Sequence, residues 1–487
     1  MATQTHGQLR FLLVPLMSQS HLIPFTDMAK LLAHHGMAVS IIITPLNAIR
    51  FNEIIDYAKQ LNLSIQFISL KFPGAEVGLP EGCENMDSLP SPSLAPKFFD
   101  ASNMLQKQLE NLLAESEIKP DCIVSDLCLP WTSNISIKFN IPRLIFHTVS
   151  CFCLLCCHNI ERHKVMQSIT SSSEPFLIPD IPDKIEFTEP QLPMTRSDLS
   201  DGFRARMTTF REAEDSAEGI LVNTFEELEP RYVEEYNKVK RIWCMGPLFF
   251  ASDTFAGENY NKAPIDHEAL QWLDSKPPST VIYVCFGSLS RLKSQQLMEI
   301  GLGLEASNHS FIWVIRNGDQ LTELEKWFEE YKFEEKITGR GLIIKGWAPQ
   351  VSILSHSATG GFLTHCGWNS TLEGVTAGKP MGTWPMFAEQ FYNEKLLVEV
   401  LKIGVRVGVE TSVPWAEKQK IEALVEKGKI KKAVEMVMEE GGEGEERRRR
   451  AREIGESAKK ALKEGGSSYL STTSLIQHIM KLQISRQ

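Results

Sequence analysis

The sequence has 487 residues, of which 43% are hydrophobic and 23% are charged, a composition that excludes fibrous and disordered proteins. This length predicts about two to three domains. The formal net charge of −10 disfavours a protein that binds nucleic acid through a broad basic surface. The first residues lack the basic start and apolar core of a signal peptide, and no apolar run reaches about 18 residues. We therefore expect a cytoplasmic protein without a transmembrane segment and without a nucleic-acid partner.

In the amino-terminal half, apolar runs of strand length alternate with helical segments. A polar loop over residues 18–21 follows the first strand, and the next helix runs through Lys30 to His35, where Gly36 can end it. Continuous apolar strands that alternate with helices indicate a parallel sheet with both faces covered. The predicted strands are Phe11–Leu16, Val39–Ile43, Cys122–Ser125 and Arg143–Phe146.

The carboxy-terminal half repeats this design. A loop over residues 287–290 follows its first strand, and Ser294 is expected to cap a helix that runs to Ser307. The fold class is therefore α/β, with two doubly wound domains that face each other across a cleft. The predicted strands are Val281–Phe286, Phe311–Ile315, Leu342–Ile344 and Gly361–Thr364.

The stretch between the two halves is polar, rich in turn residues and without a hydrophobic period, which indicates a linker. We expect a first domain over residues 1–250, a linker over 251–265 and a second domain over 266–466. Residues 467–487 are expected to form a helix that packs back on the first domain. We expect the protein to be a monomer.

Three motifs suggest ligand binding but lie in the wrong context. The run Gly301–Ala306 matches a dinucleotide fingerprint, yet it lies late in a helix instead of directly after a strand. The charged run 439–450 is interpreted as an exposed helix with Glu–Arg pairs four residues apart. The four cysteines of Cys151–Cys157 lack paired metal-ligand spacing, so a buried helix is favoured there over a metal site.

Ligands of doubly wound sheets bind beyond the carboxyl ends of the strands, and His21, Asp126 and Ser288 all fall at such ends. An imidazole can remove a proton near neutral pH. A carboxylate on its other nitrogen would fix the tautomer and stabilise the cation. His21 is therefore a candidate general base with Asp126 as its partner, a pairing that the spacing alone leaves open.

The segment GGFLTHCGWNSTLEG, residues 360–374, joins a predicted strand to a predicted helix. A metal needs more converging ligands than His365 and Cys366 offer, and a thiol nucleophile would need a base pointing toward it. Ser370 and Glu373 match a capping box, which would give them a structural role. A helix that starts after a strand also offers free amides to a phosphate. The side chains that can join these amides are His365, Asn369 and Ser370.

The run from Trp347 to Gln390 closely resembles the signature box of plant family-one UDP-dependent glycosyltransferases. The likeness extends to Ser20-His21, Ser125-Asp126 and Phe286-Gly-Ser288, and so to most of the chain. The opening Met-Ser-Gln-Ser-His21 and the cysteine segment look most like the subgroup that acts on flavonoids, triterpenoids and steroids. The resemblance implies a GT-B fold, with the acceptor held by the first domain and the UDP-sugar by the second.

The resemblance also implies a role for each residue of the box. Trp347 would stack on uracil, and the backbone of Ala348 would pair with its edge. Gln350 and Glu373 would bind the ribose hydroxyls. The diphosphate would be held by Ser288, His365, Asn369 and Ser370. The sugar would contact Trp368, Glu389 and Gln390, together with Thr148 from the first domain.

The implied reaction is an inverting transfer of glucose from UDP-glucose, a co-substrate, to a hydroxyl of a small apolar acceptor. His21 would be the general base and Asp126 its orienting partner. The sequence contains no D-x-D motif, so neither a metal nor a cofactor is expected. The resemblance implies that Gln390 favours glucose, because some galactose-using relatives have His at this position. The apolar wall expected for the acceptor comprises Met17, Pro92, Phe98, Phe99 and Cys151–Cys157.

Two alternatives remain open. The same fold could use UDP-galactose, UDP-xylose or UDP-glucuronate as the donor. A nucleotide-sugar-binding protein without catalysis is the other, and the intact His21 and Asp126 argue against it.

Overall fold

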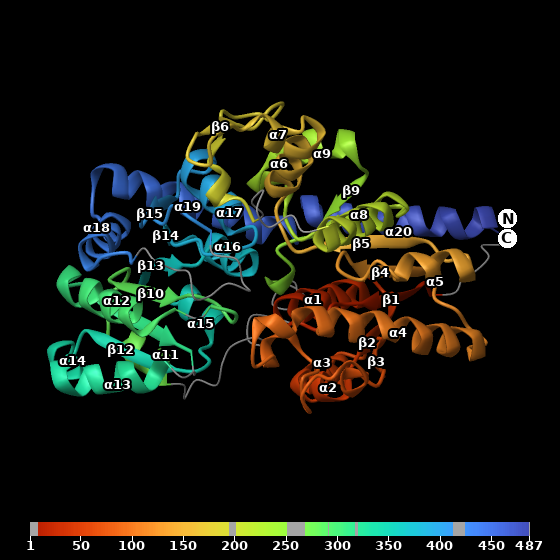
Figure 1. The fold of residues 1–487 in the computed structure, drawn as a ribbon, viewed down its shortest axis with the longest axis horizontal. Helices are drawn as coiled ribbons and strands as arrows, with labels where there is room; N and C mark the ends of the chain where they lie inside the picture. Colours follow the sequence, from red (N-terminus) through yellow and green to blue (C-terminus); the bar gives the residue numbers. More distant parts are fainter. Residues whose placement is uncertain are drawn as a thin grey trace.

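The computed structural model describes residues 8–193, 201–250, 268–290, 292–316, 320–412 and 424–486. Two parallel sheets form its framework, one in each half of the chain (Figure 1). The prediction of an α/β protein with two doubly wound domains is confirmed. The expected linker over residues 251–265 lies outside the described residues, and the domain boundaries stay a prediction.

The amino-terminal sheet has seven strands in the order β3-β2-β1-β4-β5-β8-β9, and every neighbouring pair is parallel. Successive side chains of the interior strand β1 face opposite sides of the sheet, because side chains alternate along a strand. Phe11 packs in the hydrophobic cluster of one face, and Leu12 packs in the cluster of the other. The strands are β1 Arg10–Val14, β2 Ala38–Ile43, β3 Ile65–Ser69, β4 Cys122–Asp126, β5 Arg143–His147, β8 Gly219–Val222 and β9 Ile242–Cys244.

Helices cover both faces of this sheet. A separate two-stranded antiparallel sheet is formed by β6 Phe176–Leu177 and β7 Glu186–Phe187. The helix that follows β1 ends at His34, and Gly36 has a φ of +82°, the left-handed conformation expected for the residue that ends a helix. The helices of this half are α1 Gln19–His34, α2 Pro45–Arg50, α3 Asn52–Gln60, α4 Ala95–Glu115, α5 Thr132–Phe139, α6 Cys151–Arg162, α7 Val165–Ser168, α8 Asp201–Asp215 and α9 Pro230–Val239.

The carboxy-terminal sheet has six parallel strands in the order β12-β11-β10-β13-β14-β15. Its strands are β10 Val281–Cys285, β11 Ser310–Ile315, β12 Gly341–Lys345, β13 Thr359–Thr364, β14 Met381–Thr383 and β15 Gly404–Arg406. Its helices are α11 Glu268–Asp274, α12 Ser294–Ser307, α13 Gln320–Tyr331, α14 Phe333–Lys336, α15 Gln350–Ser355, α16 Trp368–Thr376, α17 Gln390–Lys395, α18 Lys427–Met438 and α19 Gly442–Ala461.

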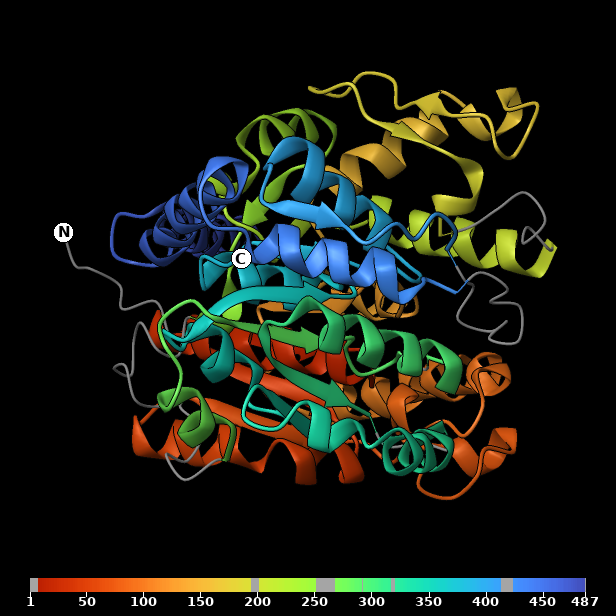
Figure 2. The same ribbon diagram turned by 90° about the vertical axis from the view of Figure 1, so that its left-hand side faces the viewer.

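The small-residue run Gly301–Ala306 lies within α12, as the sequence predicted, and the structure shows that this helix packs against α18. Figure 2 views this half from outside and shows α12 and α18 side by side. A Cβ added at Gly303 would lie 2.7 Å from the Cβ of Ile430, so only glycine allows this approach. The prediction that Ser294 caps α12 is wrong: Ser294 is the first helical residue, and Lys293, with an extended backbone, occupies the cap position.

The last helix, α20 (Ser467–Arg486), lies against the amino-terminal half (Figure 1). Leu475 and Ile479 are fully buried in the hydrophobic cluster that contains β1 and α1. The hydroxyl of Ser468 donates to the carbonyl of Gly246 at 2.6 Å, and the amide of Gln483 donates to the carbonyl of Asp121 at 2.8 Å. The chain therefore returns to its first half after it has completed the second.

Candidate active site

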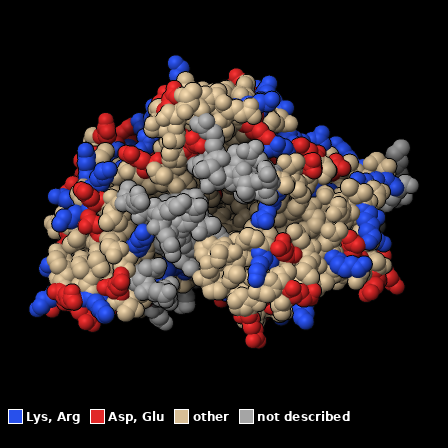
Figure 3. All heavy atoms as spheres, in the orientation of Figure 1, with Lys and Arg blue, Asp and Glu red and all other residues tan. Residues whose placement is uncertain are grey.

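The two halves enclose a cavity of about 1000 Å³. Its walls include the carboxyl ends of β10 and β11, the loop after β13 and the first turns of α1, α15 and α16, in agreement with the strand-end rule. Figure 3 shows a hollow between the two halves, and it shows acidic and basic side chains interspersed over this face. The cavity brings together all the residues of the signature box that the sequence singled out, together with His21 and Thr148.

His21 and Asp126 form a hydrogen-bonded pair at this cavity. Nδ1 of His21 lies 2.6 Å from Oδ2 of Asp126, and the carboxylate is 98% removed from solvent. The other oxygen of Asp126 accepts the backbone amide of Cys128 at 2.9 Å, which fixes the carboxylate. The chain spacing of these two residues left their pairing open, and the parallel pairing of β1 with β4 is what brings them together.

The electrostatics of the pair suit a proton-accepting imidazole beside an ionised carboxylate. Burial is the largest single influence and disfavours the charged imidazole. The carboxylates of Asp126, Glu389 and Asp87, with Asp126 foremost, together outweigh burial and hold the pKa of His21 above its ordinary value. Burial likewise opposes the charge of Asp126, yet His21 holds the pKa of that carboxyl below its ordinary value. With Nδ1–H donated to Asp126, the lone pair of Nε2 is free to accept a proton.

Across the cavity, β13 ends at Thr364 and α16 begins at Trp368, so a helix start faces the His21 wall. Gly287 and Gly367 pack directly on the ring of His365, where an added Cβ would lie 2.5 Å and 2.3 Å from ring atoms. Burial lowers the pKa of His365 to about 4, so the ring is neutral. The first-turn amides of α16 and a neutral imidazole form a set of hydrogen-bond donors suited to an anion.

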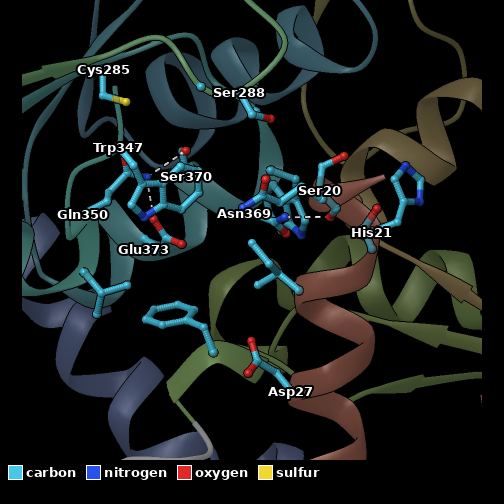
Figure 4. Close-up of a pocket in the computed structure, with 18 of the residues that line it drawn as sticks. Ser20, His21, Asp27, Cys285, Ser288, Trp347, Gln350, Asn369, Ser370 and Glu373 are labelled. Atoms are coloured by element: carbon cyan, nitrogen blue, oxygen red, sulfur yellow. Dashed lines mark hydrogen bonds between the residues drawn. The ribbon is translucent and has the colours of Figure 1, made fainter. Parts of the chain in front are cut away.

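The capping box predicted for Ser370 and Glu373 is wrong. Gly367 is the N-cap of α16, which makes Ser370 the third helical residue, and no side chain caps the helix. Both residues instead bind Gln350, whose Nε2 donates to Oγ of Ser370 at 3.0 Å and to Oε2 of Glu373 at 2.5 Å (Figure 4). Tyr283 completes the group by donating its hydroxyl to Oε1 of Gln350 at 3.2 Å. Burial raises the pKa of Glu373 to about 7 despite the bond from Gln350.

Trp347 is exposed to an extent unusual for its size, with 59% of its surface accessible at the mouth of this group. The guanidinium of Arg316 lies 5.3 Å from the centre of its ring. Ala348 is buried, and its carbonyl accepts the amide of Gln350 at 2.9 Å. An exposed aromatic face beside carboxamide and carboxylate groups is suited to a nucleoside.

Trp368 and Asn369 connect the two halves. The indole Nε1 of Trp368 donates to the backbone carbonyl of Asn223 at 2.7 Å, and the side chain is 2% exposed. Nδ2 of Asn369 donates to the carbonyl of Ser20 at 2.8 Å, next to His21 (Figure 4). The backbone amide of Trp368 donates to Oε1 of Glu389 at 3.2 Å. Trp368 thus faces the cavity through its backbone more than through its buried indole.

The remaining predicted residues are divided between the cavity and the core. Ser288, Thr148, Glu389 and Gln390 line the cavity, and Oε1 of Gln390 accepts the amides of Met386 and Phe387. Members of the expected apolar wall pack in hydrophobic clusters: Met17 and Phe98 in one, Cys151, Cys153 and Cys156 in another. Cys366 is also fully buried, and burial raises the pKa of its thiol.

Sequence reasoning missed several residues that line the cavity. Arg316 directly follows β11, so the strand-end rule would have identified it. Tyr283 lies within an apolar strand, and no sequence pattern indicates its hydrogen bond to Gln350. Asp27 and Lys30, a buried pair at 3.0 Å on α1, looked like ordinary helix residues. Among the described residues, none of the helices has both the length and the apolar character needed to cross a membrane.

Comparison with known proteins agrees with this geometry. Residues 101–434 match the family model described as UDP-glucoronosyl and UDP-glucosyl transferase. UDP-glycosyltransferase 73C5 of Arabidopsis thaliana is 48% identical over 99% of this chain and 98% of its own length. UDP-glycosyltransferase 73C25 of Barbarea vulgaris is 48% identical over 97% of both chains.

Solved structures show the same likeness. Glycyrrhiza uralensis UGT73P12, complexed with glycyrrhetinic acid 3-O-monoglucuronide, superposes with a TM-score of 0.88 at 36% identity, over 98% of this chain and 97% of that one. TcCGT1 in complex with UDP superposes with a TM-score of 0.79 at 26% identity, over 98% and 100%. With its two Rossmann-like sheets and its signature box, this chain belongs to the plant family-one UDP-glycosyltransferases and is an enzyme of the GT-B fold.

Proposed function

We propose that this enzyme transfers glucose from UDP-glucose to a hydroxyl of an apolar plant metabolite, with inversion at the anomeric carbon. The observation that carries the proposal is the His21–Asp126 pair, joined at 2.6 Å and placed across the cavity from the helix start of α16. A base on one wall and a set of anion-binding donors on the other is the arrangement that a single in-line displacement requires.

In the proposed reaction, Nε2 of His21 takes the proton of the acceptor hydroxyl, and Asp126 stabilises the imidazolium that forms. The acceptor oxygen forms a bond to the anomeric carbon as the bond from that carbon to the phosphate oxygen breaks. UDP leaves from the opposite face with the electron pair. One displacement inverts the anomeric configuration, so an α-linked donor gives a β-glucoside.

The departing phosphate would be stabilised by the amides at the start of α16, by Ser288 and Ser370, and by the neutral ring of His365. Uracil would stack on Trp347, and the ribose hydroxyls would bind Glu373 and Gln350. Trp368 would act through its backbone amide, which holds Glu389 at the cavity, because its indole is already bonded to Asn223. No metal is needed in this scheme, because donors from the chain supply the positive potential.

Glucose is proposed as the sugar because Gln390 and Glu389 stand where the family resemblance places glucose contacts, and both line the cavity. Support for an apolar acceptor comes from the Glycyrrhiza uralensis structure, whose bound molecule is glycyrrhetinic acid 3-O-monoglucuronide. We further propose that the enzyme acts as a cytoplasmic monomer. UDP-galactose, UDP-xylose and UDP-glucuronate are the alternative donors.

The test is a matrix of these four UDP-sugars against flavonoid, triterpenoid and steroid acceptors, with product masses measured and the anomeric configuration determined by NMR. A hexose added from UDP-glucose in β-linkage supports the proposal. If only another sugar is transferred, the proposed donor UDP-glucose is wrong. An α-linked product would exclude the proposed mechanism of one inverting displacement. UDP binding without any transfer would favour a non-catalytic binding protein.

A further inference from the structure

The helix that carries His21 lacks the side-chain cap expected at its start. Ser18 occupies the N-cap position of α1, but its hydroxyl makes no bond to the first-turn amides. It lies 3.1 Å from the hydroxyl of Ser20 instead. The carbonyl of Ser18 accepts the amide of His21 at 3.0 Å, so the position of the base depends on how this first turn is held.

A carboxylate from a distant part of the chain takes the place of the cap. Oδ2 of Asp87 accepts the backbone amide of Gln19, the first residue of α1, at 3.0 Å. The neighbouring amide of Met86 donates to the carbonyl of Met17 at 2.9 Å. The short 3-10 turn Met86–Ser88 is therefore bonded to both sides of the loop that leads into His21.

This turn is itself held by a buried amide network. The side chain of Asn85 accepts the backbone amide of Asp87 at 2.9 Å and donates to Oδ1 of Asn47 at 2.8 Å. Asn47 in turn donates to the hydroxyl of Thr44 and to the carbonyl of Glu84, both at 2.8 Å. Asn47 and Asn85 are buried, so these bonds hold Asp87 in one place relative to β2 and α2.

The charge of Asp87 acts on His21 as well as on the helix. Its second oxygen is buried and accepts no hydrogen bond from the residues that the structure describes. The charged groups that act on His21 are Asp126, Glu389 and Asp87, and those that act on Asp87 include Arg50 and Arg316. Burial raises the pKa of Asp87, and the Gln19 amide and the two arginines oppose that rise.

We propose that Asp87 is a positioning residue for the transfer reaction: it caps the helix that carries the base, and its negative charge strengthens His21 as a proton acceptor. The inference rests on the proposed role of His21. The residue is not catalytic in the strict sense, because its contacts are with the backbone of α1 and its effect on the acceptor passes through His21.

The experiment separates the charge from the cap. Asp87→Asn removes the charge and leaves an oxygen that can accept the Gln19 amide, whereas Asp87→Ala removes both. The matched control is Glu84→Gln in the same segment, because Glu84 accepts the amide of Leu46 at 2.9 Å at the start of α2. The readouts are UDP affinity, kcat, the KM for the acceptor, and the pH dependence of kcat/KM.

We expect Asp87→Asn to move the acid limb of kcat/KM to lower pH by about half a unit, because the imidazolium loses a stabilising charge. Its kcat on the plateau should fall about threefold, since the base is weaker. Asp87→Ala should lower kcat about tenfold through the loosened first turn. UDP affinity should stay unchanged in both, and Glu84→Gln should match the wild type.

A pH profile of Asp87→Asn that superposes on the wild type overturns the inference, and so does an equal shift in Glu84→Gln, which would assign the effect to the segment as a whole. If Asp87→Ala does not fold, the pH profile of Asp87→Asn is sufficient to test the role of Asp87.

If His21→Ala retains turnover, His21 is not the base, and the proposed function is wrong before the role of Asp87 is considered. An inactive His21→Ala beside an unchanged Asp87→Asn rejects only the role of Asp87.

Discussion

Two histidines line the same cavity from opposite walls, and the protein gives them opposite properties. His21 is hydrogen-bonded to a buried carboxylate that holds its pKa above the ordinary value. His365 is enclosed by two glycines, its Nδ1 is buried without a hydrogen-bond partner among the described residues, and burial lowers its pKa to about 4. The difference teaches that the partner of a histidine decides its chemistry: one ring can cycle a proton near neutral pH, and the other stays a neutral donor.

The largest expected effect comes from removing the ring that we propose accepts the proton. His21→Ala should lower kcat by about 10²–10⁴-fold, the range for loss of a general base. UDP affinity, measured by calorimetry, should be unchanged, because the groups proposed to bind the nucleotide lie on the other wall. Turnover close to that of the wild type would remove His21 from the mechanism.

Removing only the partner of that ring should have the next largest effect. Asp126→Asn should lower kcat about 10²-fold, because the tautomer and orientation of His21 are no longer fixed. The acid limb of kcat/KM should also move to lower pH, since Asp126 now raises the pKa of His21. His365→Gln is the control, and its limb should stay in place. If the acid limb of kcat/KM shifts in His365→Gln and not in Asp126→Asn, then His365 and not His21 is the titrating base.

The opposite wall can be tested by disturbing His365 without replacing it. Gly367 has a φ of −60°, which any residue adopts, but an added Cβ would lie 2.3 Å from Nε2 of His365. Gly367→Ala should therefore displace the ring and weaken UDP binding about tenfold, with a smaller effect on kcat. Gly428→Ala is the matched control, because nothing lies within 4 Å of its added methyl group. Unchanged UDP affinity in Gly367→Ala would contradict a phosphate-binding role for His365.

The smallest expected effect concerns Glu373, whose pKa burial raises to about 7. A raised pKa in the folded state means that stability is lost as the pH rises from about 4.5 through about 7. Glu373→Gln should abolish this loss and leave stability below about pH 4.5 unchanged, as followed by thermal unfolding at several pH values. Its UDP affinity should no longer rise with pH, because only the carboxylate is a strong acceptor for ribose hydroxyls. If UDP affinity depends on pH equally in the wild type and in Glu373→Gln, the Glu373 carboxylate does not bind the ribose.

The strands and the strand-end residues could be predicted from the sequence, because apolar runs and the parallel-sheet rule depend on local pattern and on topology. All eight predicted strands fall within two residues of the observed bounds. His21, Asp126 and the helix start with His365, Asn369 and Ser370 follow from the same rule. The roles of the other signature-box residues came from the family resemblance. Arg316 follows the same rule and was overlooked.

Contacts between distant segments could not be predicted in this way. The start of α16 at Trp368 coincides with the bond from its indole to Asn223, a residue of the other half, and this start excludes the capping box. Asp87 lies in a segment without a hydrophobic period, so no pattern connected it to α1. The expected acceptor wall was inferred from apolar composition, which does not distinguish a core from a pocket.

The return of α20 to the first half has a consequence for synthesis. Leu475, Ile476 and Ile479 complete the hydrophobic cluster that also contains Phe11 and Phe25. During translation, the apolar face formed by β1 and α1 therefore stays uncovered until residues near 479 have left the ribosome. A fragment that ends before α20 is expected to leave this apolar face exposed and to aggregate.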